Sequence, residues 1–241
     1  MKIQHIVQMG ALFMSVGLSS SLADDPSDTT ERRWNDVGIV LTLDRSLKSL
    51  CPGAQGRIEL ATGTWIEAVD HLPPISFNIV DERIGSPGAN MDGINSITAG
   101  QITIDGHEND LGVAIVFEDS STREIIEADI VFNSKYDFYC SSMCGKDRYD
   151  LQSVATHELG HFFGLPDRID DPSSSMYIYT EKCDVSKRNL DSQDTEAMES
   201  LYSVEDKEPV VTDSSCSIRS SRGGQKPWLL VIILALLIRR K

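Results

Sequence analysis

The sequence predicts a mixed α/β fold of the α+β type, in which one twisted, mixed sheet carries long helices. Along the chain, one β-branched strand segment is followed by a helix and then by several strand segments before the next helix. This order favours a mixed sheet over a strictly alternating barrel. A later helical stretch carries two closely spaced histidines, and a smaller irregular part with one final helix follows it. With 40% hydrophobic residues in 241, the chain has enough apolar material for one such domain plus processing segments.

Four segments are predicted to be strands because they are short, apolar and bounded by turn-forming residues. In chain order they are residues 37–43 (VGIVLTL), 75–80, 112–117 (GVAIVF) and 127–132 (EADIVF). The stretch from Gly85 to Asn95 is predicted to be a loop from its glycine, proline and asparagine content.

Three helices are predicted from apolar residues that recur at helical spacing. The first covers residues 58–69, the second runs from Asp150 to about Phe163, and the last covers Asp191 to Tyr202. Asp150 is a suitable N-cap, and Gly164 can end the second helix in a left-handed conformation. This second helix contains both histidines of the motif described below.

The N-terminus predicts export. Lys2, an apolar stretch from Met9 to Leu18 and small residues ending at Ala23 are typical of a signal peptide, which would occupy residues 1–23. A buried N-terminal helix is the alternative. We expect one globular domain at residues 24–203 and a disordered linker at 204–227.

The excess of acidic over basic side chains argues against a nucleic-acid partner. With 37 acidic and 22 basic side chains, the chain has a formal charge of −15 and concentrates no basic face. A nucleic-acid partner would require such a face, so we expect none.

Export also bears on the five cysteines, which would meet an oxidising compartment. Four of them could form two disulfides in any of three connectivities, and Cys140 and Cys144 are close enough in sequence to close a single loop. A metal site on this pair is the less favoured alternative because no second cysteine pair at zinc-ribbon spacing accompanies it.

The segment 157–167 reads HELGHFFGLPD and predicts a zinc site. His157 and His161 are one helical turn apart, so both imidazoles can reach one ion. Glu158 can serve as the catalytic base. The five-residue pattern alone also occurs by accident, but Gly164 turns the chain back and lets Asp167 supply a third ligand, as a catalytic zinc requires.

These residues resemble the zinc signature of the metzincin peptidases, HExxHxxGxxH, with the last histidine replaced by aspartate as in the snapalysin family. Ser175-Met176-Tyr177 resembles the Met-turn that underlies the metal in that clan. The order of elements resembles bacterial matrixin-like domains. The resemblance implies a catalytic zinc, a structural calcium ion and an edge strand at 112–117 that pairs with an extended peptide.

Two departures accompany the resemblance. Asp167 is a harder, charged ligand that changes metal affinity and water activation. The second departure is that the sequence contains no cysteine switch of the PRCGxPD type. Cys51 could act as an inhibitory ligand in its place, although a disulfide is the favoured use. Outside the motif, His71 and His107 are predicted to be solvated loop residues.

The C-terminal segment 228–241 consists of eleven apolar residues, Trp228 to Ile238, and a basic end. The run is too short for a hydrocarbon core of roughly 30 Å. With Cys216 upstream, it resembles myxosortase-type sorting tails, which implies a processing protease as partner and transient membrane insertion. A short permanent anchor or a buried helix is the alternative.

Taken together, the sequence predicts a secreted or surface-attached zinc endopeptidase that cleaves peptide bonds with a zinc-activated water and Glu158 as general base. The expected substrate is an extended peptide or protein, and the chain is expected to be a monomer. A non-catalytic surface-binding module with the same fold is the main alternative, and a zinc hydrolase for non-peptide bonds is a weaker one.

Overall fold

The described part of the chain is almost entirely the predicted catalytic domain. The computed structural model describes residues 18–19, 31–35, 38–82, 84, 91–144 and 147–203. The predicted linker and C-terminal segment, and all of the predicted signal peptide except two residues, lie outside these ranges. The processing predictions for both ends of the chain therefore stay predictions.

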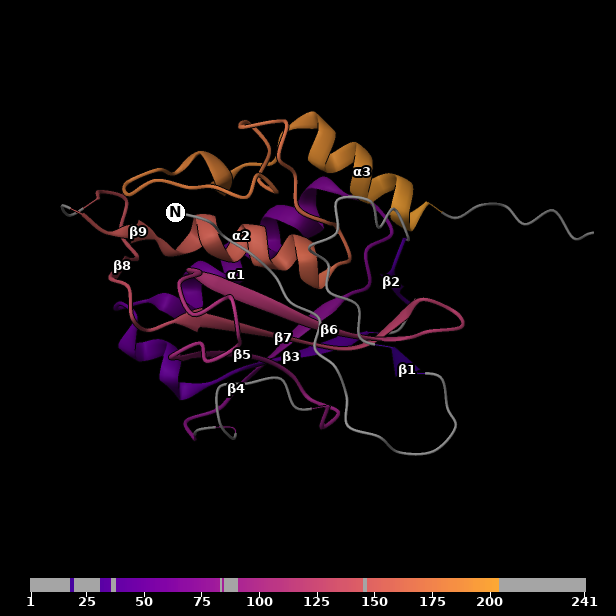
Figure 1. The fold of residues 1–241 in the computed structure, drawn as a ribbon, viewed down its shortest axis with the longest axis horizontal. Coiled ribbons are helices and arrows are strands. Elements are labelled where there is room, and N and C mark those ends of the chain that lie inside the picture. Colours follow the sequence, from indigo (N-terminus) through magenta and orange to yellow (C-terminus); the bar gives the residue numbers. More distant parts are fainter. Residues whose placement is uncertain are drawn as a thin grey trace, which may run out of the picture. The chain divides into compact units, whose positions relative to one another are not determined.

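A seven-stranded sheet forms the base of the domain (Figure 1). Its strands are β1 (Leu18–Ser19), β2 (Arg33–Trp34), β3 (Ile39–Leu43), β4 (Ile75–Ile79), β5 (Asn95–Gly100), β6 (Gly112–Asp119) and β7 (Glu124–Asn133). Their order is β1-β6-β7-β5-β3-β4, and β2 pairs with β7. Strands β3, β4, β5 and β7 run parallel, whereas β6 is antiparallel to β7. The predicted mixed sheet is confirmed.

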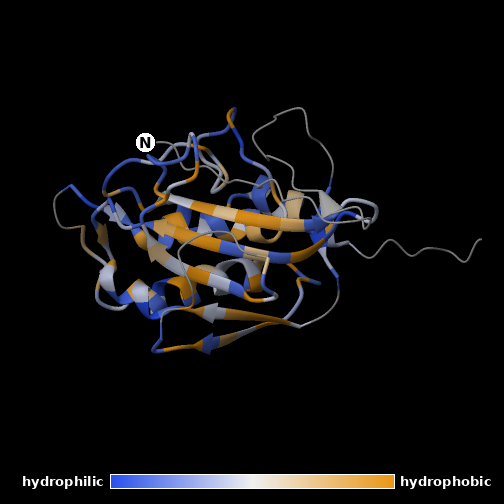
Figure 2. Cartoon of the chain, turned by 60° about the horizontal axis from the view of Figure 1, so that its bottom comes forward, coloured by the Kyte–Doolittle hydropathy of each residue, from blue (hydrophilic) through white to orange (hydrophobic). Residues whose placement is uncertain are grey.

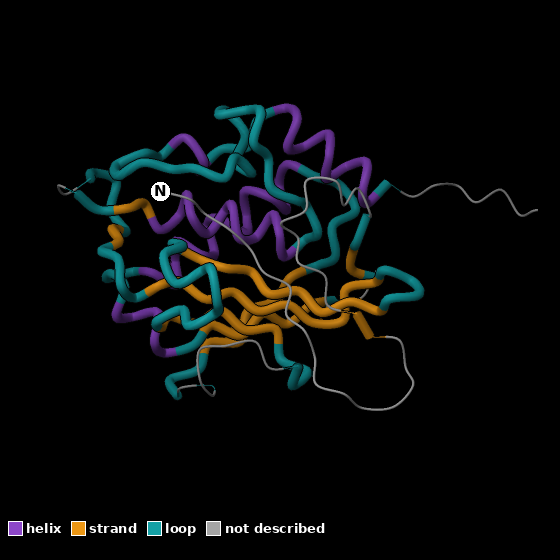
Figure 3. The backbone as a smooth tube through the Cα atoms, in the orientation of Figure 1, coloured by secondary structure: helices purple, strands orange, loops and turns teal. Residues whose placement is uncertain are grey.

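Helices cover one face of this sheet (Figure 3). The covering helices are α1 (Ala54–Ala68) and α2 (Leu151–Phe162), and α3 (Ser192–Tyr202) lies on the far side of α2 from the sheet. Two short 3-10 turns complete the helical segments, η1 (Arg45–Ser49) before α1 and η2 (Ser186–Arg188) against α2. α1 packs along α2, and the fully buried Trp65 joins them by donating its indole N–H to the Thr156 carbonyl oxygen (2.8 Å). Between α2 and α3 the chain is mostly irregular, as predicted.

Both faces of β6 are buried, for different reasons. Ala114 and Val116 point into the main core beneath α2. Val113 and Ile115 point to the opposite face, where Ile102 from the loop after β5 covers them in a second, smaller core. The strands are therefore rich in hydrophobic residues when the sheet is viewed from below (Figure 2). This double burial fixes β6 against α2 and holds it beside the histidines.

Strand β5 was not predicted. The prediction placed a loop up to Asn95 and no strand between 80 and 112, because NSITAG is poor in large apolar residues. Parallel pairing with β3 and β7 stabilises it instead. Ser96 adds to this by donating its backbone N–H and its hydroxyl to the buried Asp129 carboxylate (2.9 and 2.6 Å). Tertiary pairing overrode the local propensity here.

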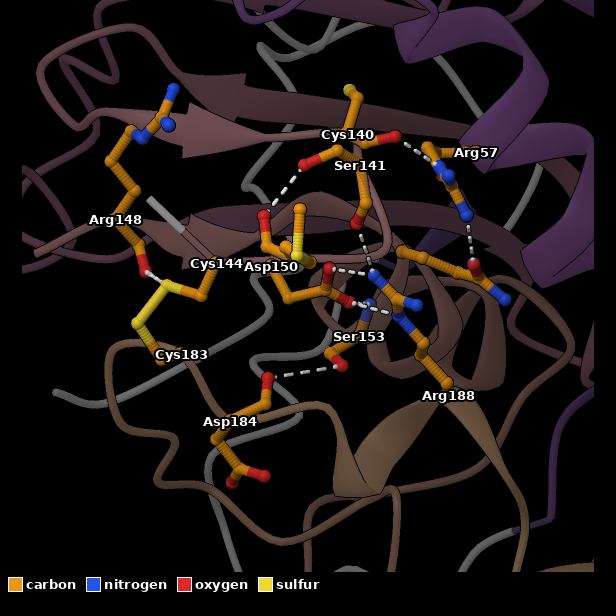
Figure 4. Close-up of polar contacts among 12 residues, drawn as sticks. Arg57, Cys140, Ser141, Cys144, Arg148, Asp150, Ser153, Cys183, Asp184 and Arg188 are labelled. Carbon is orange, nitrogen blue, oxygen red and sulfur yellow. Dashed lines mark hydrogen bonds and ion pairs between the residues drawn. A yellow bond between two sulfur atoms is a disulfide. The ribbon is translucent and has the colours of Figure 1, made fainter. Parts of the chain in front are cut away.

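Two disulfides join distant segments, as expected for four of the five cysteines, and they select a connectivity that the sequence left open. Cys51 bonds Cys140, and Cys144 bonds Cys183, with Cα–Cα distances of 5.8 and 5.3 Å. The second disulfide ties the loop before α2 to the irregular segment after it (Figure 4). Cys51, which takes part in the first disulfide, is thereby excluded as an inhibitory metal ligand.

No helix within the described ranges is long and apolar enough to cross a membrane. The terminal apolar run from Trp228 lies outside those ranges.

Candidate metal centre

The histidines lie on α2, which begins and ends where the sequence predicts. The Asp150 side chain accepts the backbone N–H of Ser153 (2.8 Å) and so caps the helix N-terminus. Every residue of α2 is buried. His157 and His161 project from one face of this buried helix, one turn apart, so their backbone positions are fixed by packing on both sides.

Three ligand atoms meet at a single point. The Nε2 atoms of His157 and His161 are 3.1 Å apart, and the Oδ1 atom of Asp167 lies 3.3 and 3.4 Å from them. Among the described residues, these three form the one group of three or more His, Cys, Asp or Glu side chains close enough to share an ion. The structure thus brings together all three predicted ligands.

Backbone carbonyls orient both imidazoles. His157 donates its Nδ1–H to the Ser175 carbonyl oxygen (2.8 Å), and His161 donates its own to the Leu165 carbonyl oxygen (2.7 Å). Since a carbonyl oxygen can only accept, Nδ1 carries a proton in both rings, which leaves Nε2 as the atom that can present a lone pair to the centre. Burial lowers the pKa of His157 to about 4, which keeps this imidazole neutral.

This arrangement fits a zinc ion. Bonds of about 2.0–2.1 Å to a tetrahedral zinc place neighbouring ligand atoms roughly 3.3–3.4 Å apart. The three measured separations of 3.1, 3.3 and 3.4 Å agree with that spacing. Two lone pairs and a carboxylate oxygen that face one another at this distance repel unless a cation lies between them.

Glu158 lies beside this centre and is fully buried. Neither carboxylate oxygen has a direct hydrogen-bond partner within the described part of the chain. Burial, and secondly the Asp167 carboxylate, raise the pKa of Glu158 well above its ordinary value, although the nearby Ala114 backbone N–H opposes this. A buried carboxylate of this kind is costly without a cation nearby, so its position also favours a metal in the centre.

The comparison with known families agrees with this geometry. The family model described as matrixin matches residues 61–203, which is more than half of the chain. The chain belongs to the matrixin family. No curated protein sequence matches it. Membership of this family supports zinc-dependent metallopeptidase activity.

In this matrixin, Met176 lies directly beneath α2. A Cβ atom at Gly160 would be 2.2 Å from the Met176 sulfur and 3.0 Å from the Trp65 ring, so only glycine admits this contact. The Asp194 carboxylate holds the turn in place by accepting the Ser175 backbone N–H (2.7 Å) and the Ser174 hydroxyl (2.5 Å). The predicted packing role of Met176 therefore has a geometric basis.

The turn at Gly164 brings Asp167 back to the histidines. Gly164 has a φ of 110°, which L residues rarely adopt. A Cβ atom there would also lie 2.1 Å from the Arg32 carbonyl oxygen, because the N-terminal segment crosses the turn. Beyond Asp167, Arg168 donates its backbone N–H to the Met176 carbonyl oxygen (2.8 Å) and so fixes the loop that carries Asp167 against the turn at Met176.

Two residues around the matrixin centre were missed. Gly112 at the start of β6 makes room for Glu158, since a Cβ there would lie 2.8 Å from Oε1. Lys187 is a buried cation in η2. An isolated glycine at a strand start and a lysine in a polar stretch give no sequence signal for either role.

The prediction for one of the two remaining histidines was wrong. His71 is exposed, as predicted. His107 is buried and bonds through Nδ1 to the Asp110 carboxylate (2.7 Å) in the loop before β6. The loop covers the second core, which takes His107 out of solvent with it.

Proposed function

We propose that the chain is a secreted or surface-attached zinc endopeptidase in which His157, His161 and Asp167 hold the catalytic zinc. The observation that carries this proposal is the set of three ligand atoms within 3.1–3.4 Å of one another, with the buried Glu158 carboxylate beside them. Family membership supplies the reaction class, and the ligand set supplies the site within this chain.

Glu158 is the proposed general base. When bound, zinc supplies Lewis-acid chemistry by lowering the pKa of a coordinated water and polarising the scissile carbonyl. Glu158 accepts the proton of the attacking water and passes it to the departing amine.

The proposed substrate is an extended peptide that lies along β6. One side of β6 pairs with β7 from Gly112 to Glu118. On its other side, within the described ranges, only Glu118 and Asp119 pair with a strand, which is β1. The segment 112–117 therefore offers backbone donors and acceptors to a peptide next to Glu158, independent of side-chain identity.

Export and surface attachment are supported by independent features. Two disulfides are typical of an oxidising compartment. The signal-peptide pattern at residues 1–23 and the sorting-type tail with Cys216 complete the proposed route, with a tail-processing protease as partner. A monomeric state and a structural calcium ion remain predictions of the same proposal.

Chelation provides the test. The chain from Asp24 onward, loaded with one equivalent of zinc, is expected to cleave a denatured generic protein, and a zinc chelator is expected to reduce cleavage to the buffer rate. Added zinc, but not magnesium, should restore it, because nitrogen ligands favour zinc. Undiminished cleavage in chelator, or zinc binding without any cleavage, would contradict the proposal, and the latter would favour the non-catalytic module.

A further inference from the structure

Lys187 is a buried cation close to the metal centre that the proposed reaction does not use. It lies in η2, and only 2% of it is exposed. Burial lowers its pKa to about 8, and the Asp194 carboxylate opposes that shift, so the amine is mostly protonated at pH 7. A buried ammonium is costly unless acceptors satisfy its three N–H donors. The position of those acceptors shows what the cation does.

All three donors of Lys187 point at the backbone of the Met-turn. Its Nζ donates to the carbonyl oxygens of Ser174 (3.3 Å), Ser175 (2.9 Å) and Tyr177. The ammonium also lies 5.7 Å from the centroid of the Tyr177 ring. One side chain thereby gathers the carbonyls that flank Met176 and fixes their direction.

One of these carbonyls is shared with a proposed metal ligand. The Ser175 oxygen accepts from Lys187 and also from the Nδ1–H of His157 (2.8 Å). The partner of the ring nitrogen opposite the metal sets the tautomer and orientation of a ligating histidine. Lys187 thus holds the atom that orients His157.

The base of Lys187 is itself anchored to α2. Arg188 makes a two-pronged ion pair with Asp150, the N-cap of α2, through contacts of 2.9 and 2.5 Å (Figure 4). The Ser153 hydroxyl donates to the Asp184 carbonyl oxygen (3.4 Å) just before η2. His157 belongs to the same helix. The contacts therefore connect α2 to η2, η2 to the Met-turn through Lys187, and the Met-turn to His157 through the Ser175 carbonyl.

We propose that Lys187 is a positioning residue for His157, acting through the Ser175 carbonyl to hold the imidazole in the metal-binding tautomer and orientation. This inference rests on the proposed function, because it assumes that His157 is a ligand. It assigns Lys187 no contact with substrate. Loss of the ammonium removes one donor from each of three carbonyls and frees the Ser175 oxygen to turn away from His157.

The test compares two lysine variants of the chain from Asp24 onward. Lys187→Met keeps an unbranched apolar stem but removes the charge and the donors. Lys182→Met removes the same charge from an exposed position in the same segment. We expect Lys187→Met to weaken zinc binding, measured by competition with a chromophoric chelator, by about 10- to 100-fold. Lys182→Met is expected to stay within about twofold of the parent, as an exposed charge has little effect.

A second readout separates positioning from mere support of the fold. At saturating cobalt, the d–d absorption bands of Lys187→Met are expected to shift relative to those of the parent, because they report ligand geometry in the folded fraction. Loss of stability alone leaves these bands in place. Parent-like zinc affinity together with parent-like cobalt bands in Lys187→Met would overturn the proposal.

Two safeguards keep the outcome decisive. If Lys187→Met does not fold, Lys187→Gln replaces it, because its uncharged and shorter side chain does not reach the position of Nζ, and parent-like zinc affinity together with parent-like cobalt bands in that variant overturns the proposal. If the parent itself binds no zinc, the proposed function fails, and zinc affinity no longer tests the positioning role of Lys187. In that case two-bond ¹H–¹⁵N spectra of the metal-free parent and of the folded Lys187 variant decide, where an unchanged His157 tautomer in the variant overturns the positioning role and loss of the Nδ1–H tautomer supports it.

Discussion

Glu158→Gln is expected to lower kcat for peptide cleavage by about two to four orders of magnitude, the usual contribution of a positioned general base. The amide has the shape of the carboxylate and fits against Gly112, but it cannot accept the proton of the attacking water. Zinc content and the circular dichroism spectrum are expected to match those of the parent. Steady-state cleavage of a fluorogenic peptide measures the effect.

The matched control for this variant is Glu199→Gln, which makes the same change at an exposed position of α3. We expect its kcat to equal that of the parent. A Glu158→Gln variant that binds zinc and retains more than about a tenth of the parent kcat would remove Glu158 from the role of base.

Gly164→Ala is expected to reduce the free energy of unfolding by about 3–5 kcal/mol, from backbone strain together with overpacking. The residue has a φ of 110°, and an added Cβ would lie 2.1 Å from the Arg32 carbonyl oxygen. Either the N-terminal segment or the turn that leads to Asp167 must move. Urea unfolding of the metal-free protein measures the loss.

Gly63→Ala is a control that is expected to change the free energy of unfolding in the opposite direction. Gly63 lies within α1, where the nearest atom to an added Cβ is a Glu67 oxygen 4.0 Å away. Alanine is favoured over glycine inside a helix by roughly 0.5–1 kcal/mol, so this variant is expected to be more stable than the parent. A Gly164→Ala loss below about 1 kcal/mol would show that the turn is not constrained as described.

The local features of the site could be predicted from the sequence because they depend on spacing within one segment. His157 and His161 are one turn apart, Asp150 caps their helix, and Gly164 ends it; each of these follows from the residues between 150 and 167 alone. The late helix after Asp191 followed from the same kind of pattern. Backbone geometry over a few residues was enough in each case.

Features that depend on distant partners could not be predicted. Strand β5 exists because two neighbouring strands pair with it, although its own residues have little strand character. The disulfide partner of Cys144 lies 39 residues away, and the other connectivities of the cysteines were equally compatible with the sequence. Lysine is usually found at the surface, and the burial of Lys187 is explained by the Met-turn carbonyls that accept from its ammonium group.

The central claim is that two histidines and one aspartate hold the catalytic zinc, and zinc K-edge X-ray absorption of the loaded chain tests it most directly. We predict two imidazoles and otherwise oxygen ligands, at about 2.0–2.1 Å, with no sulfur. Replacement Asp167→His is expected to add a third imidazole to the spectrum. A sulfur ligand at about 2.3 Å, or an unchanged imidazole count in Asp167→His, would contradict the account.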